Sequence, residues 1–304
     1  MADFSEYTGP SPDWLALEPT LPQPPKDLSV QQMKDLVNKD REESAAQDMI
    51  EQVQIHDFTV PTRDGATVEA RTYRPAGVPL SEGLPVFIYF HGGGFLFGTL
   101  ASEDAICSRI VVARAQKGTP VVVFNVNYRH SPEHQYPTSW NDTEDAFVWL
   151  HKHIKEIGGL SDQVVVGGNS AGSWMTASLA LAQLRGEDQR LAACPKIRGL
   201  VLMIPGLVML DYYAPRQDLL RSPEISSLVQ CAEAPILPIS RLNYFYHLLG
   251  VYGIKDADGD RRLNPGNATA EEVKRLPPTT FGIAGNDPLR DEGLFFGKLL
   301  SENG

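Results

Sequence analysis

One serine in this chain lies between glycines at a spacing suited to nucleophilic catalysis. The run Gly168-Asn169-Ser170-Ala171-Gly172 follows the apolar segment Val164-Val165-Val166 and precedes a stretch compatible with a helix. This context places Ser170 on a sharp strand-to-helix turn, where small neighbours leave room and the hydroxyl projects from the edge of a sheet. The next backbone N–H, from Ala171, would then face the reacting oxygen at the positive end of the helix. Ser170 is therefore the predicted nucleophile.

A glycine-rich loop lies well upstream of that serine. The run His91-Gly92-Gly93-Gly94-Phe95 directly follows a predicted strand. Consecutive glycines allow backbone N–H groups to converge on one point, which is the arrangement of an oxyanion hole. The alternative interpretation is a phosphate-binding loop, but such a loop would need a Lys-Ser or Lys-Thr pair after the glycines, and Phe95-Leu96-Phe97 follows instead.

A group of acidic residues follows the apolar run Phe281–Ala284. An acid just beyond the carboxyl end of a strand is able to orient an imidazole, which is the third role in serine, histidine and acid chemistry. Asp287 stands nearest to the strand end and is the predicted acid. Asp291 and Glu292 are expected to cap or solvate the helix that follows.

Short apolar runs that alternate with helical stretches must position these residues. That alternation is typical of a parallel sheet covered on both faces, so the predicted fold class is α/β. An antiparallel hairpin is expected first, with strands at 53–60 and 66–73 around Asp64-Gly65. Further strands are predicted at 85–90, 120–126, 163–166, 197–204 and 279–284, and helices at 103–116, 138–156, 171–184 and 270–275. The sheet should be mixed at one edge and parallel through its centre.

Two segments stand apart from this core, which is predicted to occupy residues 53–304. Residues 1–52 begin as a proline-rich arm and continue as a polar stretch with helical periodicity. Residues 205–265 interrupt the alternation and are rich in Pro, Tyr and Leu. We expect the arm and this insertion to form a cap over the carboxyl ends of the strands.

Composition limits the classes of function. A net charge of −11 without a run of Lys and Arg argues against a nucleic-acid partner. No segment approaches the roughly 20 apolar residues of a membrane span, and the N-terminus lacks a secretory signal pattern, so a cytoplasmic location is expected. Three widely spaced cysteines, Cys107, Cys194 and Cys231, predict reduced, mostly buried thiols. Neither a metal nor a cofactor is predicted, and the oligomeric state, a homodimer included, is left open.

With these features in order, the sequence resembles the hormone-sensitive-lipase-like carboxylesterases of the α/β-hydrolase fold. The resemblance covers roughly residue 53 to the end, and its marks are the segments 91–95, 127–137, 168–172 and 287–293. It implies an α/β-hydrolase fold with a mostly parallel central sheet and a helical cap. It also implies a serine hydrolase of carboxylic esters, whose partner is a small-molecule ester such as an ester or lactone of a specialised metabolite.

The resemblance also assigns roles to individual residues. Ser170 would be the nucleophile and Asp287 the acid, while the oxyanion-hole donors would be Gly93, Gly94 and Ala171. The residues that support these motifs would be His91, Gly92, Gly168 and Gly172. Two positions depart from the usual pattern: Asn169 replaces an acidic or small residue, and Ser173 replaces a glycine or other small residue.

The expected histidine is missing from its usual place. In this fold the base follows the acid along the chain, yet none of residues 288–304 is a histidine. These residues suffice for one helix, with Phe295, Phe296, Leu299 and Leu300 as its apolar face, but not for a further strand and closing helix. The sequence thus predicts a chain that stops before the last strand and helix of the fold.

Three interpretations stay open from the sequence. The chain is an esterase in which His134 or His247 substitutes for the base, or it is a truncated esterase. Alternatively, it is a non-catalytic ligand-binding protein, like the plant gibberellin receptors, which keep this fold without the catalytic histidine. Removal of the base of a serine triad costs on the order of 10⁶ in turnover, so the distinction decides activity.

Overall fold

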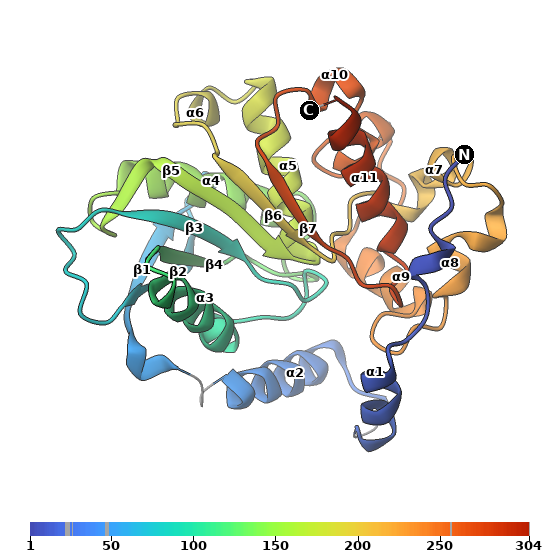
Figure 1. The fold of residues 1–304 in the computed structure, drawn as a ribbon, viewed down its shortest axis with the longest axis horizontal. Helices are drawn as coiled ribbons and strands as arrows, with labels where there is room; N and C mark the ends of the chain where they lie inside the picture. The colour runs from blue at the N-terminus through green and yellow to red at the C-terminus, as the bar shows by residue number, and fades with distance from the viewer. Residues whose placement is uncertain (22–24, 26, 46–48, 256, 304) are drawn as a thin grey trace.

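Seven strands form one sheet through the centre of the computed structural model, which describes residues 1–21, 25, 27–45, 49–255 and 257–303 (Figure 1). The order across the sheet is β1-β2-β4-β3-β5-β6-β7. The strands are β1 (Val53–Pro61), β2 (Thr67–Pro75), β3 (Leu84–Phe90), β4 (Val122–Asn127), β5 (Gly159–Asn169), β6 (Gly199–Met203) and β7 (Thr279–Gly282).

The pairing of the strands confirms a sheet that is mixed at one edge. Strand β2 pairs antiparallel with both β1 and β4, and every other neighbouring pair is parallel. The predicted hairpin turn lies at Asp64-Gly65, where Gly65 has a φ of 84°. The largest difference is in β5, which begins at Gly159 rather than at Gln163. Residues 159–162 add to the partly exposed end of that strand, where apolar patterning is weak.

Helices cover both faces of the sheet because successive side chains of a strand point to opposite faces. On β3, Tyr89 packs with helix α3 (Asp104–Gln116) on one face. Its neighbours Ile88 and Phe90 pack on the other face with α4 (Thr138–Lys152) and α5 (Ala171–Arg185). The helix that was predicted at 138–156 is shorter in the structure. It ends at Lys152, after which the chain turns toward β5.

The remaining helices lie at the two ends of the chain and in the insertion. The arm contains α1 (Pro12–Leu17) and α2 (Val30–Ala45), and α2 lies beside α3 in Figure 1. The insertion contains α7 (Ala214–Gln217), α8 (Ser227–Gln230) and α9 (Ile239–Leu249). After it come α10 (Ala270–Val273) and α11 (Arg290–Asn303). Between α5 and β6 lies the short helix α6 (Gln189–Ala192).

The start of α5 lies extremely close to the end of β3. A methyl group on Gly172 would overlap the carbonyl group of Phe90, and one on Gly168 would come within 2.5 Å of the same carbonyl oxygen. Neither glycine has a positive φ, so what excludes a side chain there is this close approach. The glycines on either side of Ser170 are thus required for the helix to pack on the central strand.

The acidic residues at the start of α11 are buried, so the prediction that they cap or solvate this helix is wrong. Glu292 is 2% exposed and accepts hydrogen bonds from the N–H groups of Leu207 at 2.5 Å and Val208 at 3.0 Å. Asp291 accepts one from the N–H of Ser227 at 2.7 Å. Both carboxyl groups therefore satisfy backbone donors of the insertion, which local sequence does not reveal. Burial raises the pKa of Glu292 to about 8.

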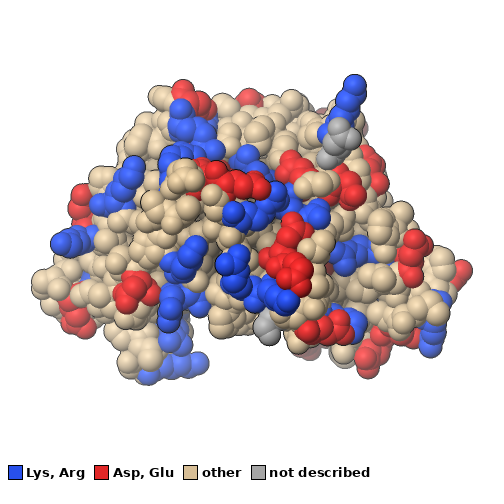
Figure 2. Space-filling view, turned by 90° about the horizontal axis from the view of Figure 1, so that it is seen from above, with Lys and Arg blue, Asp and Glu red and all other residues tan. Residues whose placement is uncertain are grey.

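The surface carries both signs of charge in close mixture. Figure 2 shows Lys and Arg side chains interspersed with Asp and Glu on the face seen from above. Cys107 and Cys231 are buried and Cys194 is partly exposed, and all three are free thiols, as predicted. Over the described ranges, no helix combines the length and apolar character that crossing a bilayer requires.

Replacement of Gly172 by alanine tests the close approach of α5 to β3. We expect Gly172→Ala to lose at least about 3 kcal/mol of unfolding free energy, because the methyl group must displace the Phe90 carbonyl. Gly297→Ala in α11 is the control, since its methyl group would meet nothing closer than 3.6 Å. It should be neutral or stabilising by up to about 1 kcal/mol. Urea unfolding checks both, and equal losses would contradict the crowding argument.

Replacement of Glu292 by glutamine tests the buried carboxyl group. Its raised pKa means that the native state keeps the proton up to about pH 8, whereas the unfolded chain loses it near the ordinary value of 4.5. Wild-type stability should therefore fall as pH rises through this window, by at most about 1.4 kcal/mol per pH unit. The variant cannot ionise, so its stability relative to wild type should increase from pH 5 to pH 8.

Thermal or urea unfolding at several pH values measures this difference. Glu271→Gln is the matched control, because Glu271 is exposed on α10. A Glu292→Gln difference that stays constant with pH, like that of the control, would show that Glu292 is ionised in the native state.

Candidate active site

The segments that were predicted to carry chemistry meet at one edge of the sheet. Strands β3, β5, β6 and β7 are parallel neighbours, so their carboxyl ends lie together. The glycine loop follows β3, Ser170 follows β5, and Asp287 follows β7. In open parallel sheets this edge is where ligands bind.

Ser170 occupies a strained backbone conformation between β5 and α5. Its φ of 51° and ψ of −114° lie in a region that residues with a side chain seldom adopt. The conformation is held by two backbone hydrogen bonds: the Ser170 N–H donates to the Met203 carbonyl at 2.8 Å, and the Trp174 N–H donates to the Ser170 carbonyl at 3.0 Å. The serine remains partly exposed. The predicted strand-to-helix turn is therefore present.

Ser173, which departs from the expected pattern, has a structural contact that accounts for it. Its hydroxyl group donates to the Gly168 carbonyl at 2.6 Å and accepts from the Met203 N–H at 2.8 Å. The side chain thus joins the ends of β5 and β6 beside Ser170. A glycine at this position would leave the Met203 N–H without this acceptor.

The glycine loop presents backbone donors beside Ser170. Gly93 and Gly94 have φ values of 140° and 62°, and their N–H groups donate to no other group in the described part of the chain. Ala171 is the first residue of α5, where N–H groups lack partners within the helix. Gly94, Ala171 and Ser170 line the same cavity, whereas Gly93 lies next to Gly94 but is not among the residues that line it. The structure therefore brings the predicted nucleophile together with two of the three predicted donors.

Phe95 fixes the end of this loop in spite of its own positive φ of 60°. Its ring stacks on Trp140 at 4.8 Å between centroids and meets Trp174 edge-on at 5.9 Å. Its carbonyl group accepts a hydrogen bond from the Ser131 N–H at 2.8 Å. Buried packing of a large ring thus offsets the backbone strain.

His91 lies behind the loop and does not line the cavity. Its ring is fully buried and stacks on Tyr128 at 4.4 Å between centroids, while the Tyr128 hydroxyl donates to the His91 carbonyl at 2.8 Å. Burial lowers the pKa of His91, so its imidazole is neutral near pH 7. The Nδ1 atom lies 3.1 Å from the Gly92 oxygen. These contacts are consistent with a role for His91 in supporting the glycine loop.

Asp287 is partly buried and has no cationic partner among the residues that the structure describes. Burial raises its pKa to about 6, and the N–H of Leu289 donates to its Oδ1 atom at 2.8 Å. Leu289 itself lines the Ser170 cavity. The predicted acid is therefore hydrogen-bonded to a residue of the cavity wall, in surroundings that would favour its charged form only if a positive group approached.

The cavity at Ser170 is small, about 30 Å³, and mostly apolar. Four of its lining side chains come from the insertion: Leu237, Leu242, Phe245 and Tyr246. The insertion was expected near this edge as a cap, but none of these four residues was predicted to line the cavity. The apolar periodicity of α9 was the available signal, since Leu242, Phe245, Tyr246 and Leu249 form its buried face.

No imidazole reaches this cavity. All seven histidines lie in the described part of the chain, and none of them lines the space around Ser170. The two proposed substitutes for the base, His134 and His247, are exposed on the surface. The described residues therefore bring Ser170 together with Gly94 and Ala171, but they place no histidine beside it.

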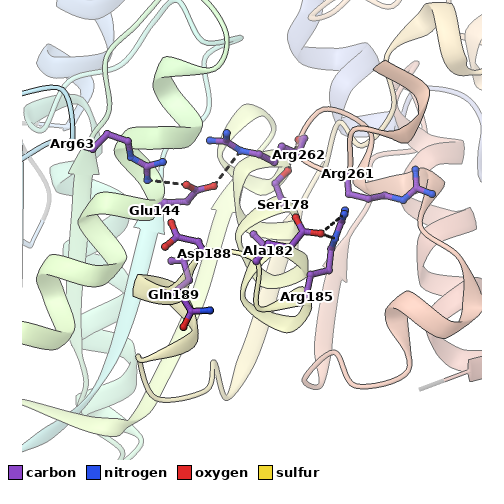
Figure 3. Close-up of a pocket in the computed structure, with 11 residues that line it drawn as sticks. Arg63, Glu144, Ser178, Ala182, Arg185, Asp188, Gln189, Arg261 and Arg262 are labelled. Carbon is purple, nitrogen blue, oxygen red and sulfur yellow. Dashed lines mark hydrogen bonds and ion pairs between the residues drawn. The ribbon is translucent and has the colours of Figure 1, made fainter. Parts of the chain in front are cut away.

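A second, larger hollow of about 430 Å³ lies elsewhere on the molecule (Figure 3). It shares no residue with the Ser170 cavity and includes Arg185, at the far end of α5. Because α5 has 15 residues, its two ends are separated by about 20 Å. The arginines on its wall already face carboxylates, as in the pair Arg63–Glu144 at 2.8 Å. Each arginine that lines this hollow is paired with a carboxylate, and the hollow lies away from the residues predicted to carry chemistry.

Comparisons with known proteins agree with the geometry. The chain is 31% identical over 238 residues to an esterase of Mycobacterium tuberculosis, LipI, an alignment that covers 78% of this chain and 66% of LipI. It is 32% identical over 256 residues to the carboxylic ester hydrolase LipN of the same organism, which covers 83% of this chain and 60% of LipN. The chain thus spans less than two thirds of the length of these two relatives.

The fold is shared with solved esterase structures. A hyperthermophilic esterase from Pyrobaculum calidifontis superimposes with a TM-score of 0.76 at 28% identity, covering 97% of this chain and 86% of that one. Residues 87–304 match the family described as the alpha/beta hydrolase fold. This match covers well over half of the chain, and the chain therefore belongs to the α/β-hydrolase fold family.

Proposed function

We propose that this protein hydrolyses carboxylic esters through an acyl-enzyme at Ser170. The observation that carries the proposal is one shared cavity, in which the strained Ser170 faces Gly94 and Ala171. The esterase relatives support the same reaction class. No cofactor takes part in this proposal.

The proposed reaction has two steps. The Ser170 oxygen attacks the ester carbonyl, and the N–H groups of Gly93, Gly94 and Ala171 stabilise the negative charge that develops on the carbonyl oxygen. Collapse of this intermediate releases the alcohol and leaves the acyl group on Ser170. Water then attacks the acyl group, which releases the carboxylic acid and restores the serine.

Both steps require a base that accepts the proton of the attacking hydroxyl and returns it to the leaving oxygen, which is the alcohol in the first step and Ser170 in the second; no residue that lines the cavity is such a base. Asp287 is proposed to orient that base, in the role of the acid in a serine triad. The raised pKa of Asp287 is consistent with a carboxyl group prepared for a positively charged neighbour and lacking one among the described residues.

The arm, residues 1–52, and the insertion, residues 205–265, are proposed to form the cap of this site. Side chains of α9 cover the cavity at Ser170, and α2 packs against the same region through Val30, Met33 and Val37. An apolar, narrow cavity favours esters whose acyl group is short and uncharged.

A second candidate function is ligand binding without turnover. The absence of every histidine from the Ser170 cavity favours it, because a serine hydroxyl without a base is a weak nucleophile. The two functions differ in one measurable property, which is covalent reaction at Ser170.

Labelling with a fluorophosphonate probe tests the proposed nucleophile. We expect stoichiometric labelling at Ser170, identified by peptide mass spectrometry, and complete loss of labelling in Ser170→Ala. Ser173→Ala is the control: its hydroxyl lies one turn away and contacts backbone only, so labelling should persist at a reduced rate.

Folded protein that stays unlabelled, with tight binding of an unreacted ester, would reject the esterase and favour the ligand-binding function. Steady release of p-nitrophenol from a short acyl ester would exclude the ligand-binding function instead. Circular dichroism of each variant establishes that it is folded.

Replacement of Leu242 by alanine tests the proposed cap. The side chain is 4% exposed and lines the cavity from α9, so its removal should admit longer acyl groups. We expect the ratio of kcat/KM for p-nitrophenyl hexanoate over p-nitrophenyl acetate to rise about tenfold. A change of this size corresponds to the binding of one or two additional methylene groups in an apolar pocket. Val229→Ala, at an exposed position of the same insertion, should leave the ratio unchanged. Equal ratios in both variants would place the acyl group elsewhere.

A further inference from the structure

The helix α2 of the N-terminal arm is bound to the loop that follows β3. The N–H of Gly98 donates to the Asn38 side chain at 2.8 Å, and the Thr99 hydroxyl donates to Glu42 at 2.5 Å. Arg41 lies between these two positions and forms an ion pair with Glu103. Residues 38, 41 and 42 share one face of the helix, because residues three and four apart are neighbours there.

Arg41 makes a further contact that reaches the glycine loop itself. Its Nη1 atom donates to the carbonyl oxygen of Gly92 at 3.3 Å, while its Nη2 atom engages Glu103. The forked guanidinium group is suited to hold two acceptors at once in fixed directions. The Gly92 oxygen is also approached by the His91 ring at 3.1 Å.

Glu103 provides a firm anchor for this arginine. Glu103 is 4% exposed, and its carboxyl group accepts hydrogen bonds from the Tyr89 hydroxyl at 3.1 Å and the Ser102 hydroxyl at 2.9 Å. Tyr89 belongs to the central strand β3. Through Glu103, Arg41 is therefore held in place by the central strand of the sheet.

A hydrogen bond that holds the Gly92 carbonyl oxygen in place also sets the direction of the Gly93 N–H. The peptide unit between Gly92 and Gly93 is planar and trans, so the carbonyl of Gly92 and the N–H of Gly93 point in opposite directions. This peptide lies beside the serine turn, since a methyl group on Gly92 would meet the Asn169 carbonyl at 2.9 Å. Glycines on both sides otherwise leave the peptide free to rotate.

We propose that Arg41 is a positioning residue, which aims the Gly93 N–H at the oxyanion through its hydrogen bond to the Gly92 carbonyl. The inference rests on the proposed esterase function, because only that function gives the Gly93 N–H a role. It assigns the arm a part in the chemical step, in addition to its place in the cap.

Kinetics of Arg41→Gln with p-nitrophenyl acetate test the proposal. Removal of a whole oxyanion donor costs about 10²–10³ in kcat, so a misdirected one should lower kcat roughly tenfold to a hundredfold. KM should stay within about twofold, since the cavity walls are unchanged. Arg41→Lys keeps the charge but not the fork, and it should also lose activity. Lys39→Gln is the control, because Lys39 is exposed on the same helix and pairs with the exposed Glu43.

A second readout is independent of turnover. Selective ¹⁵N-glycine labelling gives the amide signals of Gly93 and Gly94, and we expect the Gly93 signal to shift in Arg41→Gln and Arg41→Lys but not in Lys39→Gln. If wild-type Ser170 proves unreactive while the Gly93 signal still shifts, the esterase function fails and the positioning contact stands.

An unmoved Gly93 signal with kcat within twofold of wild type would overturn the proposal. A fall in kcat accompanied by an equal loss of thermal stability and a raised KM would overturn it too, because that pattern describes detachment of the arm. Should Arg41→Gln fail to fold, Glu103→Gln removes the charge of the anchor and leaves its size, and the same two readouts apply.

Discussion

The close contact between the start of α5 and the end of β3 is the constraint on which the rest of this structure depends. Gly168 and Gly172 bring the helix onto the Phe90 carbonyl, and the turn between them has to pass through the positive φ of Ser170. Such strain persists only where surrounding contacts over-determine the backbone. Here they come from β6, whose residue Met203 contacts both Ser170 and Ser173.

The other parts of the site are arranged around that turn by elements far apart in the sequence. The loop after β3 is held from one side by the ring of Phe95 among tryptophans and from the other by Arg41 of the arm. The insertion closes over the same place through α9. A glycine-rich loop is flexible by itself, so its geometry has to be imposed by neighbours.

Buried carboxyl groups give this edge of the sheet an unusual electrostatic character. Asp287 and Glu292 both have raised pKa values, and burial is the main cause in each. Glu292 is stabilised by backbone N–H groups, whereas Asp287 receives a single one. Asp287 is therefore the less satisfied of the two, which is consistent with its proposed role as the partner of a base.

The sequence by itself determined the sheet, its mixed edge and the positions of Ser170, Gly93, Gly94 and Asp287 at one set of strand ends, because apolar periodicity and glycine spacing are local signals. Only the tertiary structure decided which side chains enclose the cavity, that Asp291 and Glu292 are buried, and that His134 and His247 are exposed. It alone showed Arg41 on the Gly92 carbonyl. The hydrogen bonds among these contacts join residues that are 51 to 85 positions apart in the chain. No local pattern encodes which distant partner a polar side chain will meet.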